Sequence, residues 1–201
     1  MQKVGLTGSI AVGKSHVLRL FRELGCHVLD ADRVAREVVA PGTEGLERVV
    51  EAFGRETVLQ EDGNLDRAKL AAIVFADEEK RLLLNSIIHP LVFEEQARWL
   101  RSCEVADPDG IAIVDAALMI ESGGYKRFDK LIVVWCRPDL QLQRLMSRGG
   151  LSHEEALQRI ASQMPQDEKK SYADFLIDTS NSFEETRLQV TDVFDRLKLS
   201  L

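Results

Sequence analysis

The residue types and spacing near the N-terminus are those that bind the phosphates of a nucleotide. The octapeptide Gly8-Ser9-Ile10-Ala11-Val12-Gly13-Lys14-Ser15 fits the pattern G-x-x-x-x-G-K-[ST] at every fixed position. Gly8 and Gly13 allow the backbone to curl so that successive N–H groups point at an anion. Lys14 supplies a positive charge for the β- and γ-phosphates, and Ser15 supplies a hydroxyl for Mg²⁺. The sequence therefore predicts binding of a nucleoside triphosphate with magnesium.

The segments on either side of the octapeptide supply the context that this motif needs. Val4, Gly5 and Leu6 form a short apolar run suited to a buried strand. Apolar residues then recur at helical spacing from His16 to Leu24. A helix that starts near Lys14 adds the positive end of its dipole to the loop. This order of strand, loop and helix favours a phosphate-binding loop over an ordinary glycine-rich turn.

Composition and charge narrow the class of protein. The 201 residues suit one domain with an insertion or two, and the net charge of −7 comes without any basic run. Nucleic acid is therefore not expected as the main ligand. No apolar stretch approaches the ~20 residues of a membrane span. With no signal peptide apparent, we expect a cytoplasmic protein. Cys26, Cys103 and Cys136 lack metal-ligand spacing and are interpreted as ordinary buried or half-buried thiols of a reducing compartment.

Short apolar strands alternate with helices along the chain. The expected strands are Val4–Thr7, His27–Leu29, Ile111–Val114, Leu131–Cys136 and Phe175–Ile177. Because these runs are continuously apolar, we expect burial on both faces and hence a parallel sheet in a doubly wound α/β fold. A final helix over 182–198 opens with Ser182 as its cap and Glu185 three residues on, which predicts a capping box.

Two insertions interrupt this alternation. Residues 34–103 are expected to be nearly all helical, with breaks at Pro41-Gly42, Gly54, Gly63-Asn64 and Pro90. Because ligands bind at the carboxyl ends of the strands, this subdomain is placed to cover the phosphate acceptor. A polar helical excursion over 148–172 is interpreted as a mobile lid over the triphosphate. The core then consists of 1–33, 104–147 and 173–201.

Several acidic residues follow the predicted strands. Asp32 comes just after the second strand, where its carboxylate could accept or orient the proton of a substrate hydroxyl. The alternative is a helix cap for the segment that begins at Arg33. Asp30 is interpreted as a cap or as a ligand of a magnesium-bound water. Asp115 ends an apolar strand and has the form of a magnesium-holding Walker B acid, with a structural or capping role as the alternative.

Other charged residues carry weaker signals. Arg144 and Arg148 flank the helix after the fourth strand, and Arg159 and Lys169 lie in the predicted lid. Arginines there could clamp phosphoryl oxygens or stack on adenine, or they could form a solvated helix surface. Pro90 is interpreted as the first residue of a helix, with His89 at or near its cap. Glu121 lies within reach of the same sheet edge as Asp115, with no independent signal.

Further motifs along the chain are those of one known family, and the resemblance runs from about residue 3 to residue 195. Leu6 to Ser15 matches the opening Leu-Thr-Gly-x-Ile-x-x-Gly-Lys-Ser of the dephospho-coenzyme A kinases, which this sequence resembles. The same family's further motifs correspond to Asp30-Ala31-Asp32, Val34 to Val39, Pro41-Gly42, Phe53-Gly54, Asp62 to Arg67, Val74-Phe75, Ile88 to Leu91 and Glu155 to Pro165. The phosphate loop alone is shared by many kinases, whereas the later motifs, in this order, are much more specific.

The resemblance implies a P-loop kinase-type three-layer α/β fold. It has a parallel five-stranded sheet, an inserted helical acceptor-binding subdomain and a helical lid. The implied reaction uses ATP and Mg²⁺ to phosphorylate the ribose 3′-hydroxyl of dephospho-coenzyme A, giving coenzyme A and ADP. Only these small molecules are expected as partners, with the chain a monomer or small homo-oligomer.

The resemblance also assigns roles to individual residues. Lys14, Asp32 and Arg144 are the expected catalytic residues, with Asp32 facing the 3′-hydroxyl and Arg144 beside the adenine. Arg67 and His89 would lie in the acceptor site. The remaining roles are phosphate binding by Gly8 and by residues 11–16 (Ala11, Val12, Gly13, Lys14, Ser15 and His16), metal binding by Ser15 and Asp115, and lid functions for Arg148, Arg159 and Gln163.

The chain departs from the family pattern in two places. Ala11 and Val12 stand where the family commonly has glycine and a small residue. If position 11 needs a left-handed backbone, alanine costs about 1–2 kcal/mol there, and the β-branched Val12 stiffens the loop. Ala117 replaces a proline beyond Asp115, which predicts a looser turn. We expect an active enzyme with weaker nucleotide binding.

Two other functions are compatible with the phosphate loop. One is a small kinase of the same fold that acts on a nucleotide or a polyol. The other is a nucleotide-dependent switch or assembly ATPase without a small acceptor. The sequence contains no Asn-Lys-x-Asp run for guanine recognition and is short for a motor. Only the resemblance selects the acceptor.

Overall fold

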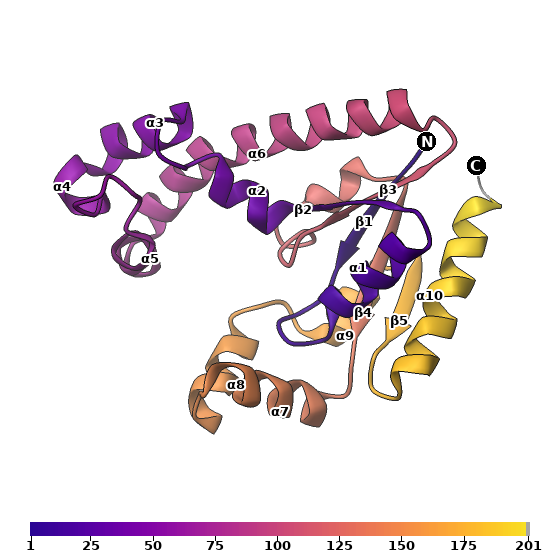
Figure 1. The fold of residues 1–201 in the computed structure, drawn as a ribbon. Helices are drawn as coiled ribbons and strands as arrows, with labels where there is room; N and C mark the ends of the chain where they lie inside the picture. The colour runs from indigo at the N-terminus through magenta and orange to yellow at the C-terminus, as the bar shows by residue number, and fades with distance from the viewer. Residues whose placement is uncertain (200–201) are drawn as a thin grey trace. The chain divides into compact units, whose positions relative to one another are not determined.

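The computed structural model describes residues 1–199, which form two compact units (Figure 1). One unit combines Met1–Asp30 with the chain from Leu100 onward, and it is an α/β structure. The other unit, Ala31–Trp99, contains helices. The chain leaves the α/β unit directly after its second strand and returns to it within a long helix.

The α/β unit is built on a sheet of five parallel strands. Its order is β2-β3-β1-β4-β5, so β1 lies at the centre. The strands are β1 (Gln2–Thr7), β2 (His27–Asp30), β3 (Ile111–Asp115), β4 (Lys130–Trp135) and β5 (Phe175–Asp178). All five residues of β3 are buried, as expected for a strand covered on both faces. The predicted parallel five-stranded sheet is confirmed.

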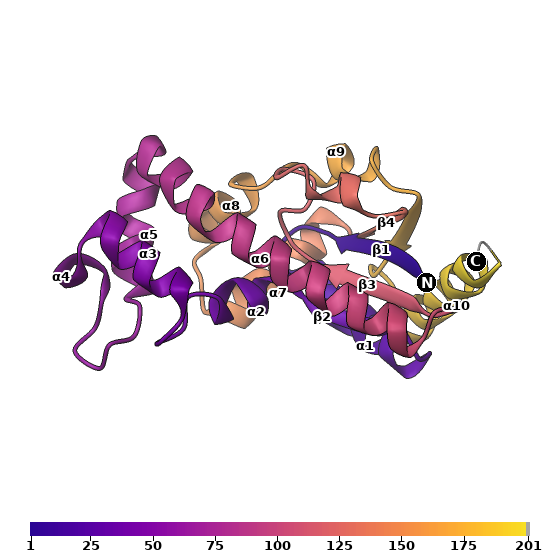
Figure 2. The same cartoon turned by 90° about the horizontal axis from the view of Figure 1, so that it is seen from above.

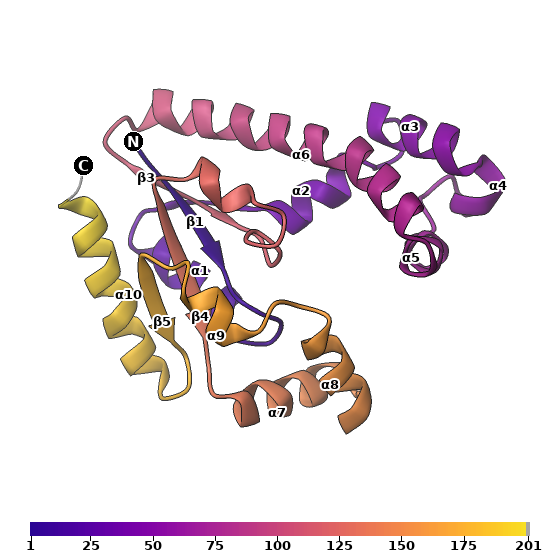
Figure 3. The same ribbon diagram turned by 180° about the vertical axis from the view of Figure 1, so that it is seen from behind.

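Helices cover both faces of the sheet. Helices α1 (Lys14–Glu23) and α10 (Phe183–Lys198) pack beside each other on one face (Figure 2). Figures 1 and 3 show α1 and α9 (Gln166–Lys170) on opposite faces. The remaining elements of this unit are η1 (Gly124–Arg127), α7 (Pro138–Gly149) and α8 (His153–Ala161). Within residues 1–199, no helix combines the length and the apolar character that crossing a membrane requires.

The start of α10 confirms half of the predicted capping box. Ser182 Oγ accepts the Glu185 N–H at 3.1 Å, as an N-cap serine should. The Glu185 carboxylate instead accepts the Asn181 side-chain amide at 2.8 Å. A reciprocal capping box forms at α8, between Ser152 and Glu155, where none was predicted.

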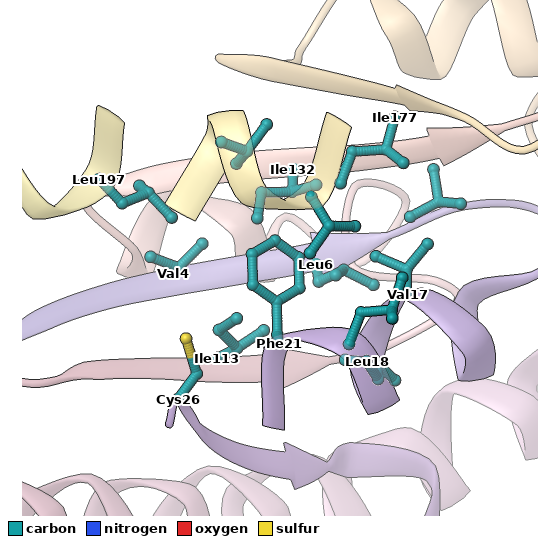
Figure 4. Packing of buried hydrophobic residues seen from close by; sticks show 14 of the residues in the cluster. Val4, Leu6, Val17, Leu18, Phe21, Cys26, Ile113, Ile132, Ile177 and Leu197 are labelled. Carbon is teal, nitrogen blue, oxygen red and sulfur yellow. The ribbon is translucent and has the colours of Figure 1, made fainter. Parts of the chain in front are cut away.

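Apolar side chains from α1, α10 and the strands form the main core of this unit. Phe21 projects from α1 toward β1, where Val4 and Leu6 lie, and Leu197 closes the cluster from α10 (Figure 4). All four of these side chains are completely buried. The apolar spacing in α1 thus positions the helix whose first turn ends the phosphate loop.

The helical unit has a core of its own. It comprises α2 (Ala31–Glu37), α3 (Glu44–Phe53), α4 (Arg55–Val58), α5 (Arg67–Ala76) and the first part of α6 (Glu78–Ala106). The buried residues of this core cluster are Val39, Leu46, Val49, Val58, Leu65 and Leu70. The predicted breaks at Pro41-Gly42, Gly54 and Gly63-Asn64 are confirmed.

The predicted helix start at Pro90 is wrong. Pro90 lies inside α6, which continues without interruption from Glu78 to Ala106 (Figure 2). A proline there removes one helical hydrogen bond and costs about 3 kcal/mol. Apolar contacts on both sides of the proline compensate, because Ile87 and Ile88 pack on the core of the helical unit and Val92 is buried. His89 is therefore a mid-helix residue and not a cap.

Two leucines of the α/β unit, one buried and one exposed, test the assigned core. Leu20→Ala in α1, where the leucine is 2% exposed, should cost about 2–5 kcal/mol of unfolding free energy because it leaves a cavity. Leu188→Ala in α10, where the leucine is 62% exposed, should cost about 0.5 kcal/mol or less. Urea unfolding followed by circular dichroism measures both changes. Equal losses would contradict the assigned core.

Candidate active site

The phosphate loop connects β1 to α1, and few residue types can adopt its backbone conformation. A Cβ on Gly8 would lie 2.3 Å from the Val134 carbonyl oxygen of β4, so only glycine fits there. Gly13 precedes α1 with φ of 92°, in the left-handed region. Ala11 also has a positive φ, 61°, and is the only non-glycine residue with one among residues 1–199. Position 11 therefore does require the left-handed backbone that makes an alanine costly.

The second departure, Val12, has a packing role. Its side chain is completely buried and belongs to the main core of the α/β unit. A β-branched side chain in this place anchors the loop to the core. Val12 therefore holds the loop against the core of the α/β unit.

A cavity of about 220 Å³ opens over the loop. Its lining combines loop residues with two arginines of α7: Ser9, Ala11, Val12, Gly13, Lys14, Ser15, Arg144 and Arg148. The ammonium of Lys14 donates to the Gly8 carbonyl at 3.1 Å. Three cations in one small cavity create a local positive field in a chain whose net charge is −7. Arg148, predicted in the lid, lies in the last turn of α7.

A second cavity of about 350 Å³ shares Gly13 and Arg144 with the first. Its other lining residues are His16, Thr179, Asn181, Phe183 and Thr186. The His16 N–H donates to the Gly13 carbonyl at 3.0 Å. The imidazole meets the Phe183 ring edge-on with centroids 4.8 Å apart. Burial, with a contribution from Arg19, lowers the pKa of His16.

Carboxylates gather where β2 and β3 end. The sheet register pairs Asp30 with Asp115, and β1 lies beside β3 with Leu6 opposite Asp115. Asp115 is 9% exposed. Since β1 leads directly into the phosphate loop, these two acids and the Ser15 hydroxyl lie at the same edge of the sheet. Hard oxygen donors of this kind are the ligands that Mg²⁺ accepts.

Contacts from outside hold the turn beyond Asp115 in place of the missing proline. Thr7 Oγ1 donates to the Ala116 carbonyl at 2.8 Å and to the Ala117 carbonyl at 3.3 Å. The Lys169 ammonium donates to the Ala117 carbonyl at 2.8 Å. These bonds from β1 and α9 limit the freedom that loss of a proline would otherwise give.

Lys169 joins the lid to this turn through a buried ion pair. Its side chain is completely buried, and its ammonium lies 2.8 Å from Glu121 Oε1. The same Glu121 oxygen accepts the Met164 N–H at 3.2 Å. Burial lowers the pKa of Lys169, and the hydrogen bond and charge of Glu121 oppose that shift. Glu121, which had no independent signal in the sequence, thus forms a buried contact with Lys169 of the predicted lid.

Glutamines connect the lid and α7 to the phosphate loop. The Ile10 N–H donates to Gln163 Oε1 at 2.8 Å, which brings the predicted lid residue onto the loop. Gln141 Nε2 donates to the Ile10 carbonyl at 2.8 Å, and Gln166 Nε2 donates to Gln141 Oε1 at 2.8 Å. Arg159, the other predicted lid residue, is exposed on α8.

The predicted acceptor residues belong to the helical unit. Asp32 is exposed in the first turn of α2; because α2 begins at Ala31, the alternative of a cap for a helix starting at Arg33 is wrong. Arg67 Nη2 donates to the Arg36 carbonyl of α2 at 3.1 Å, which brings the start of α5 to α2. His89 is exposed, and its ring lies 5.9 Å from that of Phe93 in the same helix.

Sequence reasoning missed Thr179, Gln141 and Ser9. Thr179 follows β5 directly, and the place after a strand in a parallel sheet is a signal that could have identified it. Gln141 has no such signal, because a glutamine on a helix is ordinarily a surface residue, yet it is 2% exposed.

The three cysteines are buried and free, as predicted, and burial raises the pKa of Cys26 to about 12.

Comparison with known proteins gives consistent matches along the chain. Residues 2–185 match the family model described as dephospho-CoA kinase. A dephospho-CoA kinase from Carboxydothermus hydrogenoformans is 44% identical over 195 residues, which covers 97% of this chain and 94% of that protein. A solved structure from Thermus thermophilus has a TM-score of 0.84 at 32% identity, covering 98% of this chain and 97% of that one. The dephospho-CoA kinase from Campylobacter jejuni has a TM-score of 0.71 at 30% identity and covers 98% of both chains.

The buried ion pair predicts a difference between two acids that pair with adjacent lysines. Glu121→Gln should lower the unfolding free energy by about 2 kcal/mol, because it leaves the buried ammonium of Lys169 without its counter-charge. Asp167→Asn removes the partner of the adjacent Lys170, but Asp167 is 92% exposed and its loss should be within ~0.5 kcal/mol. Chemical denaturation of both variants measures the difference. A Glu121→Gln variant as stable as Asp167→Asn would contradict the assignment.

Proposed function

This chain belongs to the dephospho-CoA kinase family, and on that premise we propose which of its residues carry out phosphoryl transfer from ATP to dephospho-CoA. The observation that carries the proposal is the cavity that the phosphate loop forms with Lys14, Arg144 and Arg148. Phosphoryl transfer needs little covalent participation from the protein and depends on positioning and charge neutralisation. A loop whose cavity is lined by three cations is suited to that task.

The nucleotide is proposed to lie across the two cavities that share Arg144. Backbone N–H groups of the loop, from Ala11 to Ser15, and the Lys14 ammonium would hold the phosphates in the smaller cavity, whereas the His16 N–H donates to the Gly13 carbonyl and His16 lines the larger cavity. The base would lie in the larger one, whose lining offers the faces of His16 and Phe183 together with the Asn181 amide. Arg144 would then lie between base and phosphates and neutralise charge that develops during transfer.

Magnesium is proposed to be held at the carboxyl edge of the sheet. The Ser15 hydroxyl and the Asp115 carboxylate would be its protein ligands, and Asp30 would orient a bound water. When bound there, the ion would neutralise charge on the β- and γ-phosphates. The register that places Asp30 beside Asp115 supports this assignment. Two adjacent carboxylates repel each other, and a divalent cation relieves that repulsion.

Asp32 is proposed as the group that acts on the acceptor. Its carboxylate would accept a hydrogen bond from the ribose 3′-hydroxyl, orient that oxygen for in-line attack and take its proton as the new bond forms. Arg67 and His89 would contribute to binding the acceptor within the helical unit. The exposure of Asp32 in the first turn of α2, away from a capping position, supports a role toward a ligand.

The lid is proposed to exclude water from the transferring group. Gln163 contacts the loop at Ile10, and Arg148 already lines the phosphate cavity from the helix that leads into the lid. Arg159 on α8 would reach the triphosphate when the lid moves. Closure of this kind protects ATP from hydrolysis and strengthens each electrostatic contact.

Cytoplasmic location and a monomer or small homo-oligomer stay predictions from the sequence.

Replacing Asp32 tests the acceptor role. Asp32→Asn should lower kcat by about 10²-fold or more, because it removes the base but keeps the size of the side chain. The KM for ATP should change little. ADP release measured with and without dephospho-CoA separates transfer from hydrolysis. Asp109→Asn, an exposed aspartate of the α/β unit, is the matched control. A near-normal kcat for Asp32→Asn would exclude its role as base.

Replacing Asp115 tests the metal site. Asp115→Asn should raise the Mg²⁺ concentration for half-maximal rate by about tenfold, since an amide is a weaker ligand than a carboxylate. The KM for dephospho-CoA should stay close to that of the unaltered enzyme. A magnesium titration at saturating ATP measures the shift, and thermal unfolding checks that the variant is folded. An unchanged magnesium requirement would remove Asp115 from the metal site.

A further inference from the structure

Ala11 has a backbone conformation that an L-residue disfavours. Its φ of 61° brings Cβ close to the following carbonyl, a strain that glycine avoids. Strained residues persist only where the surrounding structure determines their conformation from several sides. The contacts of Ile10 and Val12, the neighbours of Ala11, therefore decide whether the loop keeps its shape.

Ile10 is held through both of its backbone groups. Its carbonyl accepts Gln141 Nε2 at 2.8 Å, and its N–H donates to Gln163 Oε1 at 2.8 Å. Gln141 is 2% exposed, and its own Oε1 accepts Gln166 Nε2 at 2.8 Å. With both ends of its amide engaged and no room to rotate, Gln141 fixes the peptide that enters Ala11.

Val12 is held just as firmly on the other side. Its carbonyl accepts the buried Thr179 hydroxyl at 2.6 Å, and its side chain is completely buried in the core. Arg144 Nη1 donates to Thr179 Oγ1 at 3.1 Å, which orients that hydroxyl toward Val12. The Arg144 Nη2 group donates to the Thr179 carbonyl at 2.8 Å.

Both sets of contacts begin on α7. Gln141 and Arg144 are three residues apart and share a face of that helix, so one rigid element restrains both neighbours of Ala11. We propose that Gln141 and Thr179 are positioning residues that hold Ala11 in the left-handed conformation on which nucleotide binding by this loop depends. This inference rests on the proposed function, because it takes the loop to be the site of MgATP.

A double-mutant cycle between positions 11 and 141 tests the inference. Gln141→Met keeps the length of the side chain but removes the amide, so in the natural chain it should weaken binding of a non-hydrolysable MgATP analogue by about tenfold. In an Ala11→Gly background the loop no longer needs restraint, and the same change should cost about threefold or less. Isothermal titration calorimetry measures all four proteins. KM for ATP should follow the same pattern, while KM for dephospho-CoA stays nearly constant.

A matched glutamine separates this effect from general destabilisation. Gln189 on α10 bridges both backbone groups of Asp178, at 2.8 and 2.9 Å, in a similar way. Gln189→Met should be additive with Ala11→Gly. Thr179→Val repeats the cycle from the Val12 side and keeps the test open if Gln141→Met does not fold. Equal losses from Gln141→Met in the natural chain and in the Ala11→Gly background, or no loss in either, would overturn the inference. Absence of analogue binding by the unaltered chain would contradict the proposed function instead.

Discussion

The curvature of the phosphate loop is the constraint on which the rest of the α/β unit depends. Backbone N–H groups can surround an anion where some residues of a loop leave the usual regions of φ and ψ. In this chain Gly8, Ala11 and Gly13 do so, each under a different restraint. Gly8 lies against the backbone of β4, Gly13 leads into α1, and Ala11 is held through its neighbours. The parallel sheet, α1 and α7 all act on this short segment.

The parallel sheet brings the functional residues together because the carboxyl ends of its strands meet at one edge. β1 ends in the phosphate loop, β2 and β3 end in paired aspartates, and β5 ends beside Thr179. None of these residues is near another in sequence. Their proximity follows from the strand order and register of the sheet.

Buried polar groups link the lid to that edge. The side chain of Lys169 is completely buried, and its charged ammonium contacts Glu121 and the Ala117 carbonyl. Such a pair contributes less to stability than apolar packing would, but it requires one specific arrangement. The glutamines at 141, 163 and 166 act in the same way, since each hydrogen bond has one geometry. Specific placement of the loop is thus obtained from polar contacts, and stability from the apolar core.

The sequence by itself determined the phosphate loop, the five strands, most of the helix breaks and the family, because each depends on residues close together in the chain. Tertiary structure decided the rest. Pro90 continues a helix because apolar contacts on both sides offset its cost, and Gln141 reaches Ile10 across 131 positions. Thr179 reaches Val12 across 167 positions. Local spacing carries no information about such contacts, since they form only when the sheet has brought distant segments together. Whether an alanine can stand in for glycine at position 11 is therefore a property of the fold.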